Sequence, residues 1–161
     1  MTRASHHLTE NVKLLQKAVV VHRGEVLLLR RDANSASRAL QWDLPGGNSE
    51  WPDGSRSGNN LHAQDIAREI EEETAIHIIP DQFKHDTLLL FETYFFAEVF
   101  TILVGWLVEL PEDFDRDQVK ISHEHDQLVW QPFEESAGYD FGFANEFIVP
   151  MIRRAKDKTH G

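Results

Sequence analysis

The sequence predicts an α+β fold in which helices cover a β-sheet. Two apolar runs, residues 18–21 and 26–29, flank a short polar connection that contains Gly24, and this arrangement is typical of a β-hairpin. A stretch with helical periodicity, residues 61–74, lies between this hairpin and further strand-like runs. Amphipathic spacing after Pro132 indicates a C-terminal helix that packs on the sheet.

The remaining elements follow in chain order. Residues 30–60 are polar and rich in turn-forming residues, which predicts a long, folded-over loop before the first helix. Asn59 or Asn60 is the expected N-cap of that helix. Apolar and β-branched runs downstream predict further strands with a turn near Ala97. These strands are expected at residues 76–79, 87–91, 99–109 and 128–130.

Length and composition point to one domain. The chain has 161 residues, of which 41% are hydrophobic, and this is enough for a single core. The domain is expected to span residues 12–157, with a flexible N-terminal tail at 1–11 and a C-terminal tail at 158–161. Three glutamates interrupt the most apolar region, residues 87–110, so no membrane span is expected. A cytoplasmic location is the default expectation.

Charge and cysteine content exclude several classes of function. The 27 acidic and 16 basic residues give a formal net charge of −11, which repels a nucleic-acid backbone, so duplex nucleic acid is not an expected partner. A small phosphorylated ligand stays compatible with this charge if divalent cations mediate its binding. The chain has no cysteine, which excludes disulfides, thiolate zinc sites and a cysteine nucleophile. His123 and His125 give only a weak zinc signal.

The first helix carries a group of carboxylates. On a helical wheel, Glu69, Glu72 and Glu73 fall within about 100° of one another, beside the buried stripe. Like charges at these spacings cost an isolated helix roughly 0.2–0.5 kcal/mol per pair, so they need solvent screening or a cation. Oxygen ligands favour a hard cation such as Mg²⁺. The competing interpretation is a solvated acidic face, which is common for runs such as residues 71–73.

Three motifs bear on this choice. Residues 68–76 resemble the second half of the Nudix box, R-E-U-x-E-E-x-G-U with U apolar. Residues 42–47 are similar to the W-x-L-P-G-G segment that opens the box. Residues 122–125, followed by Trp130, resemble the S-x-E-H segment that precedes a tryptophan-bearing strand. The chain therefore resembles the MutT-like Nudix hydrolase family over most of its length.

Three departures make this Nudix box lengthened and partly degenerate. The two halves of the box are seven positions farther apart than in the family, which predicts a loop insertion within residues 51–59. Asn60 stands where the box has its first glutamate, and Glu50 or Asp53 is a candidate substitute. Ala75 replaces the glycine at the helix end, where we expect a locally altered turn.

The resemblance implies an α/β/α sandwich with a Nudix-type mixed sheet between helices. It also implies a pyrophosphohydrolase that uses Mg²⁺, or Mn²⁺, to cleave a phosphoanhydride bond in a nucleoside diphosphate-linked small molecule. Nucleoside triphosphates are slightly preferred over nucleotide sugars and dinucleoside polyphosphates. The alternative is a catalytically impaired nucleotide-binding or regulatory module on the same fold. A homodimer is possible.

The resemblance assigns the catalytic and metal-binding candidates. The expected metal ligands are Glu69, Glu72, Glu73 and Glu124. Either Glu124 or Glu69 is the general base. Arg68 helps to shape the site, although a surface salt bridge with Glu72 is an equally good interpretation.

The substrate-binding candidates come from the loop before the helix. They are Arg30, Arg31, Arg38, Gly46 and Gly47. Guanidinium groups match phosphate oxygens, but solvated loop arginines are equally favoured. An aromatic side chain is expected to offer a face for a base, although each candidate also fits the core. These candidates are Trp42, Trp51, Tyr94 and Phe95.

Overall fold

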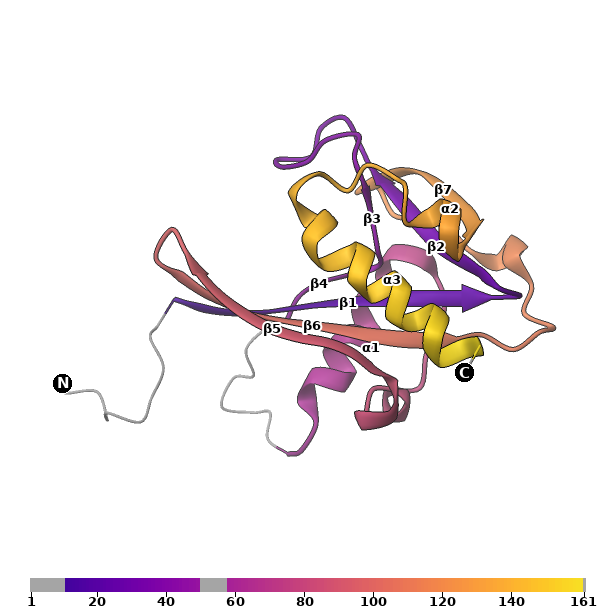
Figure 1. Ribbon diagram of the computed structural model, residues 1–161, viewed down its shortest axis with the longest axis horizontal. Helices are drawn as coiled ribbons and strands as arrows, with labels where there is room; N and C mark the ends of the chain where they lie inside the picture. The colour runs from indigo at the N-terminus through magenta and orange to yellow at the C-terminus, as the bar shows by residue number, and fades with distance from the viewer. Residues whose placement is uncertain (1–10, 50–57, 161) are drawn as a thin grey trace.

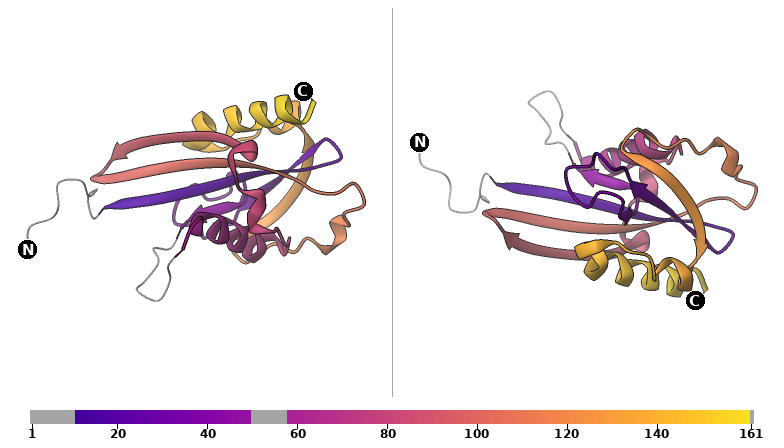
Figure 2. Two further views of the ribbon diagram at one scale, coloured as in Figure 1. Left: turned by 90° about the horizontal axis from the view of Figure 1, so that it is seen from below. Right: turned by 90° about the horizontal axis from the view of Figure 1, so that it is seen from above.

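Among residues 11–49 and 58–160, which the computed structural model describes, seven strands form one mixed sheet with helices on both faces (Figure 1). The strands are β1 (Val12–His22), β2 (Glu25–Arg31), β3 (Trp42–Asp43), β4 (Gly46–Asn48), β5 (Leu88–Phe96), β6 (Val99–Glu109) and β7 (His125–Pro132). The helix α1 (Leu61–Thr74) lies on one face, and α3 (Asn145–His160) lies on the other with the short α2 (Phe133–Ser136) beside it (Figure 2). The predicted α+β sandwich with a mixed sheet is confirmed.

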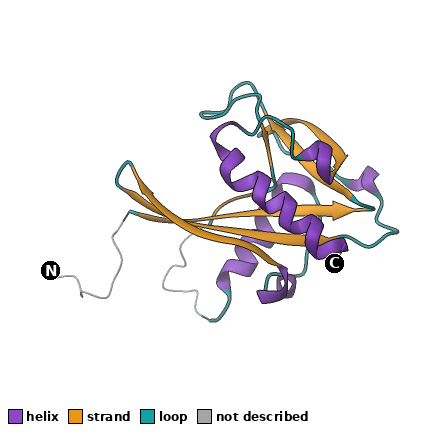
Figure 3. Cartoon of the chain, in the orientation of Figure 1, coloured by secondary structure: helices purple, strands orange, loops and turns teal. Residues whose placement is uncertain are grey.

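Short 3₁₀ helices shape the connections between these elements (Figure 3). They are η1 (Pro80–Gln82), η2 (His85–Thr87), η3 (Arg116–Gln118) and η4 (Gly142–Ala144). None of the helices in the described part of the chain is long and apolar enough to cross a bilayer.

The strand β1 changes its neighbour along its length. The sheet order is β3-β2-β1-β6-β5, with β4 paired to β1 and β7 paired to β2. β1 runs parallel to β6 from Val12 to Val21, whereas its pairing with β2 involves only Val21 and His22. Residues 15–17 of β1 pair instead with β4, the strand that leads towards α1. The segment with the two box glycines is thereby fixed beside the start of β1.

The two sides of the sheet carry separate hydrophobic clusters. Successive side chains of a strand point to opposite faces, so Val19 packs with the α3 cluster and Val20 with the α1 cluster. A Cβ at Gly105 of β6 would lie 2.0 Å from the sulfur of Met151, so the glycine lets α3 approach the sheet closely. Ile66 and Ile70 of α1 are fully buried on the opposite side. This packing fixes the rotation of α1 and hence the direction of its carboxylates.

Several predicted elements are confirmed. The hairpin is present as β1 and β2, with Val21 opposite Val26. The helix 61–74 and the strand 99–109 have the predicted bounds, and the strand predicted at 128–130 is longer, at His125–Pro132. The short strands β3 and β4 lie within the predicted loop 30–60.

Other predictions are wrong. Residues 76–79 do not form a strand, because they have no ladder partner in the described part of the chain, although Ile76 and Ile78 are buried. The helix α3 continues through residues 158–160, which were expected as a tail. Lys158 Nζ donates to the carbonyl of Asp86 at 2.8 Å and helps to anchor this last turn.

The ends of α1 also differ from expectation. Asn60 is the N-cap, but it has a left-handed backbone and its side chain caps no N–H group. Ala75 adopts the left-handed conformation itself, with φ 63°, so the turn is not altered as expected. In the predicted N-terminal tail only Asn11 is described, and its carbonyl accepts a hydrogen bond from Phe100. Glu50, Asp53 and Trp51 lie outside the described residues.

Candidate active site

The glutamates of α1 differ in their exposure to solvent because of how the helix packs on the sheet. Because Ile66 and Ile70 face the sheet, the neighbouring positions lie at the border of the core. Glu73 is 5% exposed, and the side chains of Glu69 and Glu72 are 19% and 59% exposed. The three carboxylates thus range from buried to exposed, whereas all three would be exposed on a solvated acidic face.

Glu73 lies against the first box glycine. The N–H of Gly46 donates to Glu73 Oε2 at 3.2 Å. Gly46 has φ 135°, and a Cβ there would lie 2.1 Å from the carbonyl oxygen of Gln16, so only glycine fits this approach to β1. Burial raises the pKa of Glu73 to about 8, against the opposing effects of Lys17 and the Gly46 N–H. This carboxylate therefore lacks enough positive charge to balance it.

Glu69 lies against the second box glycine. A Cβ at Gly47 would stand 3.0 Å from Glu69 Oε2, so the carboxylate fills the place that a side chain would occupy. Burial raises the pKa of Glu69, the charges of Glu72 and Glu124 raise it further, and Arg68 and Lys17 oppose them. Several acidic groups are therefore close enough to repel one another.

Arg68 bridges two of these carboxylates. Its Nη1 donates to Glu72 Oε1 at 3.0 Å, and its Nη2 lies 3.5 Å from Glu69 Oε1. Arg68 therefore forms the predicted one-turn salt bridge with Glu72 and also contacts Glu69, and its role in shaping the site stays a prediction. One guanidinium does not balance both carboxylates, because the pKa of Glu69 remains raised.

A second cluster is centred on Asp43. Its Oδ2 lies 3.2 Å from Lys17 Nζ, 3.3 Å from Arg31 Nη1 and 2.8 Å from Arg38 Nη2. Asp43 is almost fully buried, and burial opposes its ionisation, but Lys17 and Arg38 hold its pKa below the usual value. Three cations around one carboxylate leave an excess of positive charge here.

Asp43 and Lys17 were missed in the sequence analysis. Asp43 occupies the variable position of the W-x-L-P-G-G segment, and Lys17 directly precedes the apolar run of β1. A lysine at the start of a buried strand was the available signal, because a buried ammonium needs a partner. That partner, Asp43, lies in β3, and the spacing of residues in the sequence does not predict that β3 lies close to Lys17.

The predicted arginines do not all meet. Arg31 and Arg38 join at Asp43, whereas Arg30 makes a two-pronged pair with Asp126, at 2.8 and 3.0 Å. Arg30 and Arg31 are consecutive in β2, so their side chains leave the strand in opposite directions.

The loop before β7 carries Glu124 towards α1. The carbonyls at the end of α1 accept hydrogen bonds from this loop, from Lys120 N to Thr74 at 2.9 Å and from Ser122 N to Glu73 at 3.2 Å. The carbonyl of Glu124 in turn accepts from the N–H of Asp32. The side chain of Glu124 is exposed, and its charge acts on Glu69. The S-x-E-H segment is therefore tied to the helix that carries the other carboxylates.

The next residue, His125, is buried, and burial lowers its pKa. Its Nδ1 has no hydrogen-bond partner among the described residues. His123 is exposed, and no three His, Asp or Glu side chains in the described ranges are gathered closely enough to form an assembled metal site. The zinc interpretation therefore gains no support.

The α1 carboxylates nevertheless fit a hard divalent cation. They offer only oxygen donors, and burial raises the pKa of both Glu69 and Glu73, so a cation beside them would favour their ionised forms. The neighbouring Asp43 cluster, with its three cationic side chains, would in turn suit an anion.

Comparisons with known proteins agree with this picture. No family model and no curated protein matches the sequence. Among solved structures, the MutT protein of Methanosarcina mazei is 25% identical, with a TM-score of 0.67 over 96% of this chain and 100% of that chain.

Two further structures share the fold at lower identity. A Caenorhabditis elegans Ap4A hydrolase in a binary complex is 20% identical, with a TM-score of 0.65 over 92% of this chain and 98% of that chain. The NUDIX domain of Shewanella oneidensis NrtR, complexed with ADP ribose, is 15% identical, with a TM-score of 0.62 over 98% of this chain and 94% of that chain. The chain therefore has the fold of these MutT and Nudix structures over nearly its full length, with its motifs placed around α1, and these neighbours support its assignment as a Nudix pyrophosphohydrolase.

Proposed function

We propose that this protein is a metal-dependent pyrophosphohydrolase acting on a nucleoside diphosphate-linked small molecule. The observation that carries the proposal is the pairing of two oppositely charged clusters. Glu69 and Glu73 lack enough nearby positive charge to offset their burial, and Lys17, Arg31 and Arg38 surround a single buried Asp43. A cation and a phosphate chain bound together would complement both clusters.

The metal ligands in this proposal come from two segments. They are Glu69, Glu72, Glu73 and Glu124, with Mg²⁺ as the expected ion and Mn²⁺ as a substitute. When bound, the cation would neutralise phosphate charge and lower the pKa of a water molecule. Arg68 keeps Glu69 and Glu72 oriented through the two contacts described above.

The proton acceptor is Glu69 or Glu124. Burial and acidic neighbours raise the pKa of Glu69, which makes its carboxylate a stronger proton acceptor than an ordinary glutamate. Glu124 is exposed and lies on the loop before β7, not on α1. Comparing the pH profiles of Glu69→Gln and Glu124→Gln identifies the base, because only its loss removes the acidic limb of the kcat profile.

The phosphate-binding side is formed by Arg31 and Arg38. Arg31 Nε donates to the carbonyl of Ser37, and Arg38 lies 5.4 Å from the ring centre of Phe143, so both guanidinium groups are held in place. Fixed guanidinium groups bind phosphate oxygens with little ordering cost. Gly46 and Gly47 bring the backbone next to the carboxylates, where a substrate phosphate would lie.

The substrate class is a nucleotide with at least one phosphoanhydride bond. Nucleoside triphosphates are our first choice, followed by nucleotide sugars and dinucleoside polyphosphates. Two structural neighbours, an Ap4A hydrolase and a NUDIX domain complexed with ADP ribose, support this choice of chemistry. Trp42 packs edge-to-face on Tyr139 at 5.0 Å and remains half-buried, which makes it the candidate for base stacking.

The test is a screen for phosphate and pyrophosphate release from these three classes, with Mg²⁺, with Mn²⁺ and with chelator. The Glu72→Gln/Glu73→Gln variant should lose more than about 100-fold in kcat, because loss of metal ligands exceeds the 10–100-fold effect of outer groups. Glu71→Gln is the matched control, since Glu71 is on the same helix but pairs with His77 at 3.0 Å. A folded protein that binds nucleotide without turnover would indicate the impaired binding module instead.

A further inference from the structure

The strand β5 forms an open edge of the sheet. In the described ranges it pairs only with β6, so the backbone groups on its outer side have no strand partner there. The far end of the β5–β6 hairpin extends beyond both α1 and α3 (Figures 1 and 2). An exposed edge of this kind is a template for pairing with another strand.

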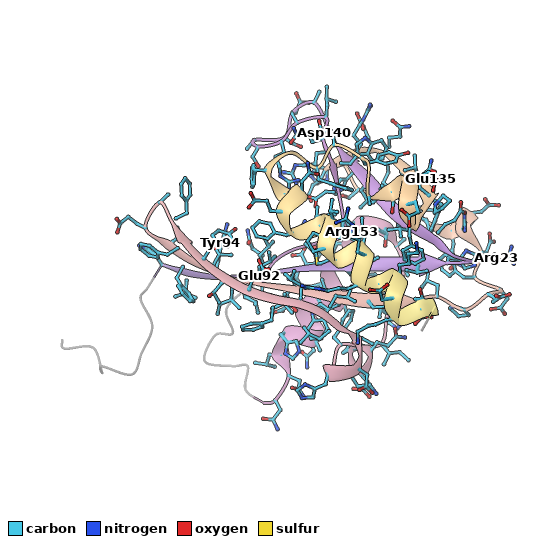
Figure 4. All side chains as sticks on the ribbon, viewed as in Figure 1. Arg23, Glu92, Tyr94, Glu135, Asp140 and Arg153 are labelled. Atoms are coloured by element: carbon cyan, nitrogen blue, oxygen red, sulfur yellow. The ribbon has the colours of Figure 1, made fainter. Side chains whose placement is uncertain are left out.

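The side chains of β5 make this edge unusually apolar. Phe91, Phe95 and Phe96 are 63%, 63% and 77% exposed. Phe91 and Phe95 share one face of the sheet with Thr93, and Phe96 lies on the other with Glu92 and Tyr94, the two β5 residues labelled in Figure 4. Exposed aromatic side chains gathered in this way mark an interaction surface.

The usual protections of an edge strand are scarce here. Edges are commonly blocked by lysine, proline or a bulge. β5 contains neither lysine nor proline, and Glu92 is its only charged residue. Its one irregularity lies between Leu88 and Leu90, away from the phenylalanines. The strand from Leu90 to Phe96 is therefore free to extend the sheet.

We propose that β5 pairs antiparallel with β5 of a second copy of this chain, around a two-fold axis at Thr93. A two-fold axis perpendicular to the sheet leaves every side chain on its original face of the sheet. Residues directly opposite each other must point to the same face, so the axis has to lie where one residue faces the same residue of the partner subunit. An axis at Glu92 would place two glutamates directly opposite each other, which is destabilising. An axis at Tyr94 would pair the two Tyr94 side chains, but it would place Phe95 opposite Thr93 and lose both Phe91–Phe95 pairs.

The register at Thr93 is self-complementary. It places Phe91 opposite Phe95 of the partner subunit on one face, twice by symmetry. On the other face it places Glu92 opposite Tyr94 of the partner subunit and Phe96 opposite Leu90 of the partner subunit. Cross-strand aromatic pairs of this kind stabilise a sheet. The one acidic side chain then meets a phenol instead of another carboxylate.

The area available suits a dimer of moderate affinity. A phenylalanine buries roughly 150–250 Å² when fully covered, so three that are mostly exposed offer about 300–500 Å² per subunit. A stable interface needs about 800 Å² per partner, and the backbone and the polar side chains of β5 must supply the remainder. We therefore expect dissociation in the micromolar range.

The first experiment is light scattering and sedimentation of the full chain at about 1–200 µM. The wild type should dimerise, and Thr93→Lys should raise the dissociation constant on the order of 100-fold, because like charges would meet at the axis. Thr93→Val is the control and should keep the dimer. Mixing Thr93→Lys with Thr93→Glu should restore association as a heterodimer. This result requires residue 93 to face itself.

A second experiment uses the absence of native cysteine. Under mild oxidation Thr93→Cys should form a disulfide-linked dimer, whereas Asp113→Cys, in an exposed loop, should not. The proposal is overturned if the wild type stays monomeric over this range, if Thr93→Lys leaves a dimer intact, or if both cysteine variants cross-link equally. Capture of a different protein by monomeric chains would likewise assign this edge to another partner.

Discussion

Asp43 and Glu73 are two buried carboxylates near the same lysine, yet their pKa values move in opposite directions. Lys17, Arg31 and Arg38 contact Asp43, and its pKa lies below the usual value despite burial. Glu73 receives one backbone hydrogen bond, and burial raises its pKa to about 8. Burial is common to both residues, so their partners make the difference.

From this contrast we infer a structural role for Asp43 and, for Glu73, the functional role proposed above. Asp43 is fully compensated and organises the cations around it. Glu73 lacks enough nearby positive charge to stay ionised at neutral pH, and groups with such perturbed pKa values cluster at functional sites. The predictions below test this division, from the largest expected effect to the smallest.

The largest effect is expected at Asp43. Asp43→Asn leaves Lys17, Arg31 and Arg38 without their common anion, and breaking such a buried network should cost about 3–5 kcal/mol of unfolding free energy. Urea unfolding at pH 7 measures it. Asp126→Asn is the control, because its pair with Arg30 is exposed and should contribute far less. Equal losses in the two variants would contradict the distinction.

Glu73 should make stability depend on pH in the metal-free protein. Its folded pKa is above its unfolded value, so its contribution is complete below about pH 4.5 and is lost as pH rises towards 8. The slope is at most about 1.4 kcal/mol per pH unit. Glu73→Gln should flatten this slope, as followed by thermal unfolding across the range. A variant that keeps the wild-type slope would disprove the assignment.

Asp43 predicts the opposite dependence. Its folded pKa lies below its unfolded value, so its contribution is complete above about pH 4 and is lost as pH falls through the folded pKa. The two carboxylates thus act on stability in separate pH ranges and with opposite signs.

The arginines should differ in their effect on substrate binding. Arg38→Ala removes a fixed guanidinium of the Asp43 cluster and should raise KM about 10–100-fold, since hydrogen bonds to charged groups are worth roughly 1.5–3 kcal/mol. Arg30→Ala removes a surface pair with Asp126 and should change KM little. Steady-state kinetics on the best substrate of the screen distinguishes them. A larger increase in KM for Arg30→Ala than for Arg38→Ala would indicate that the phosphate binds at Arg30 and not at the Asp43 cluster.

The smallest effect is expected at the end of α1. Ala75 has φ 63°, a conformation that costs an L-residue roughly 1–2 kcal/mol and glycine almost nothing. Ala75→Gly should therefore raise the unfolding free energy by about 1 kcal/mol and Tm by about 2–4 °C. Ala137→Gly, at an α-helical φ of −66°, should lower both. Calorimetry would refute the account if the two variants shifted Tm in the same direction.

Periodicity predicted most of the fold. The bounds of α1 and β6 agree with the sequence because their apolar residues recur at one spacing along the whole element. The same signal failed at residues 76–79, where Ile76 and Ile78 alternate with exposed residues but find no neighbouring strand among the described residues. Side-chain alternation reports burial, whereas a strand also requires a partner.

Motifs predicted one half of the candidate site. They named the glutamates and Glu124, which the structure arranges around the end of α1. They did not reveal the Asp43 cluster, because its members come from β1, β2, β3 and the loop between the last two, and only the folded sheet brings them together. The prediction of an altered turn at Ala75 was wrong, because the helix end keeps the left-handed conformation and Ala75 alone carries the strain.

The most direct test of the central claim is the unfolding temperature of the protein as Mg²⁺ is added. If the α1 carboxylates bind the ion, the wild type and Glu71→Gln should both gain stability, by about 2.7 kcal/mol when the free ion reaches 100 times its Kd, and Glu73→Gln should gain much less. No gain in the wild type, or an equal gain in Glu73→Gln, would contradict a cation site at these glutamates.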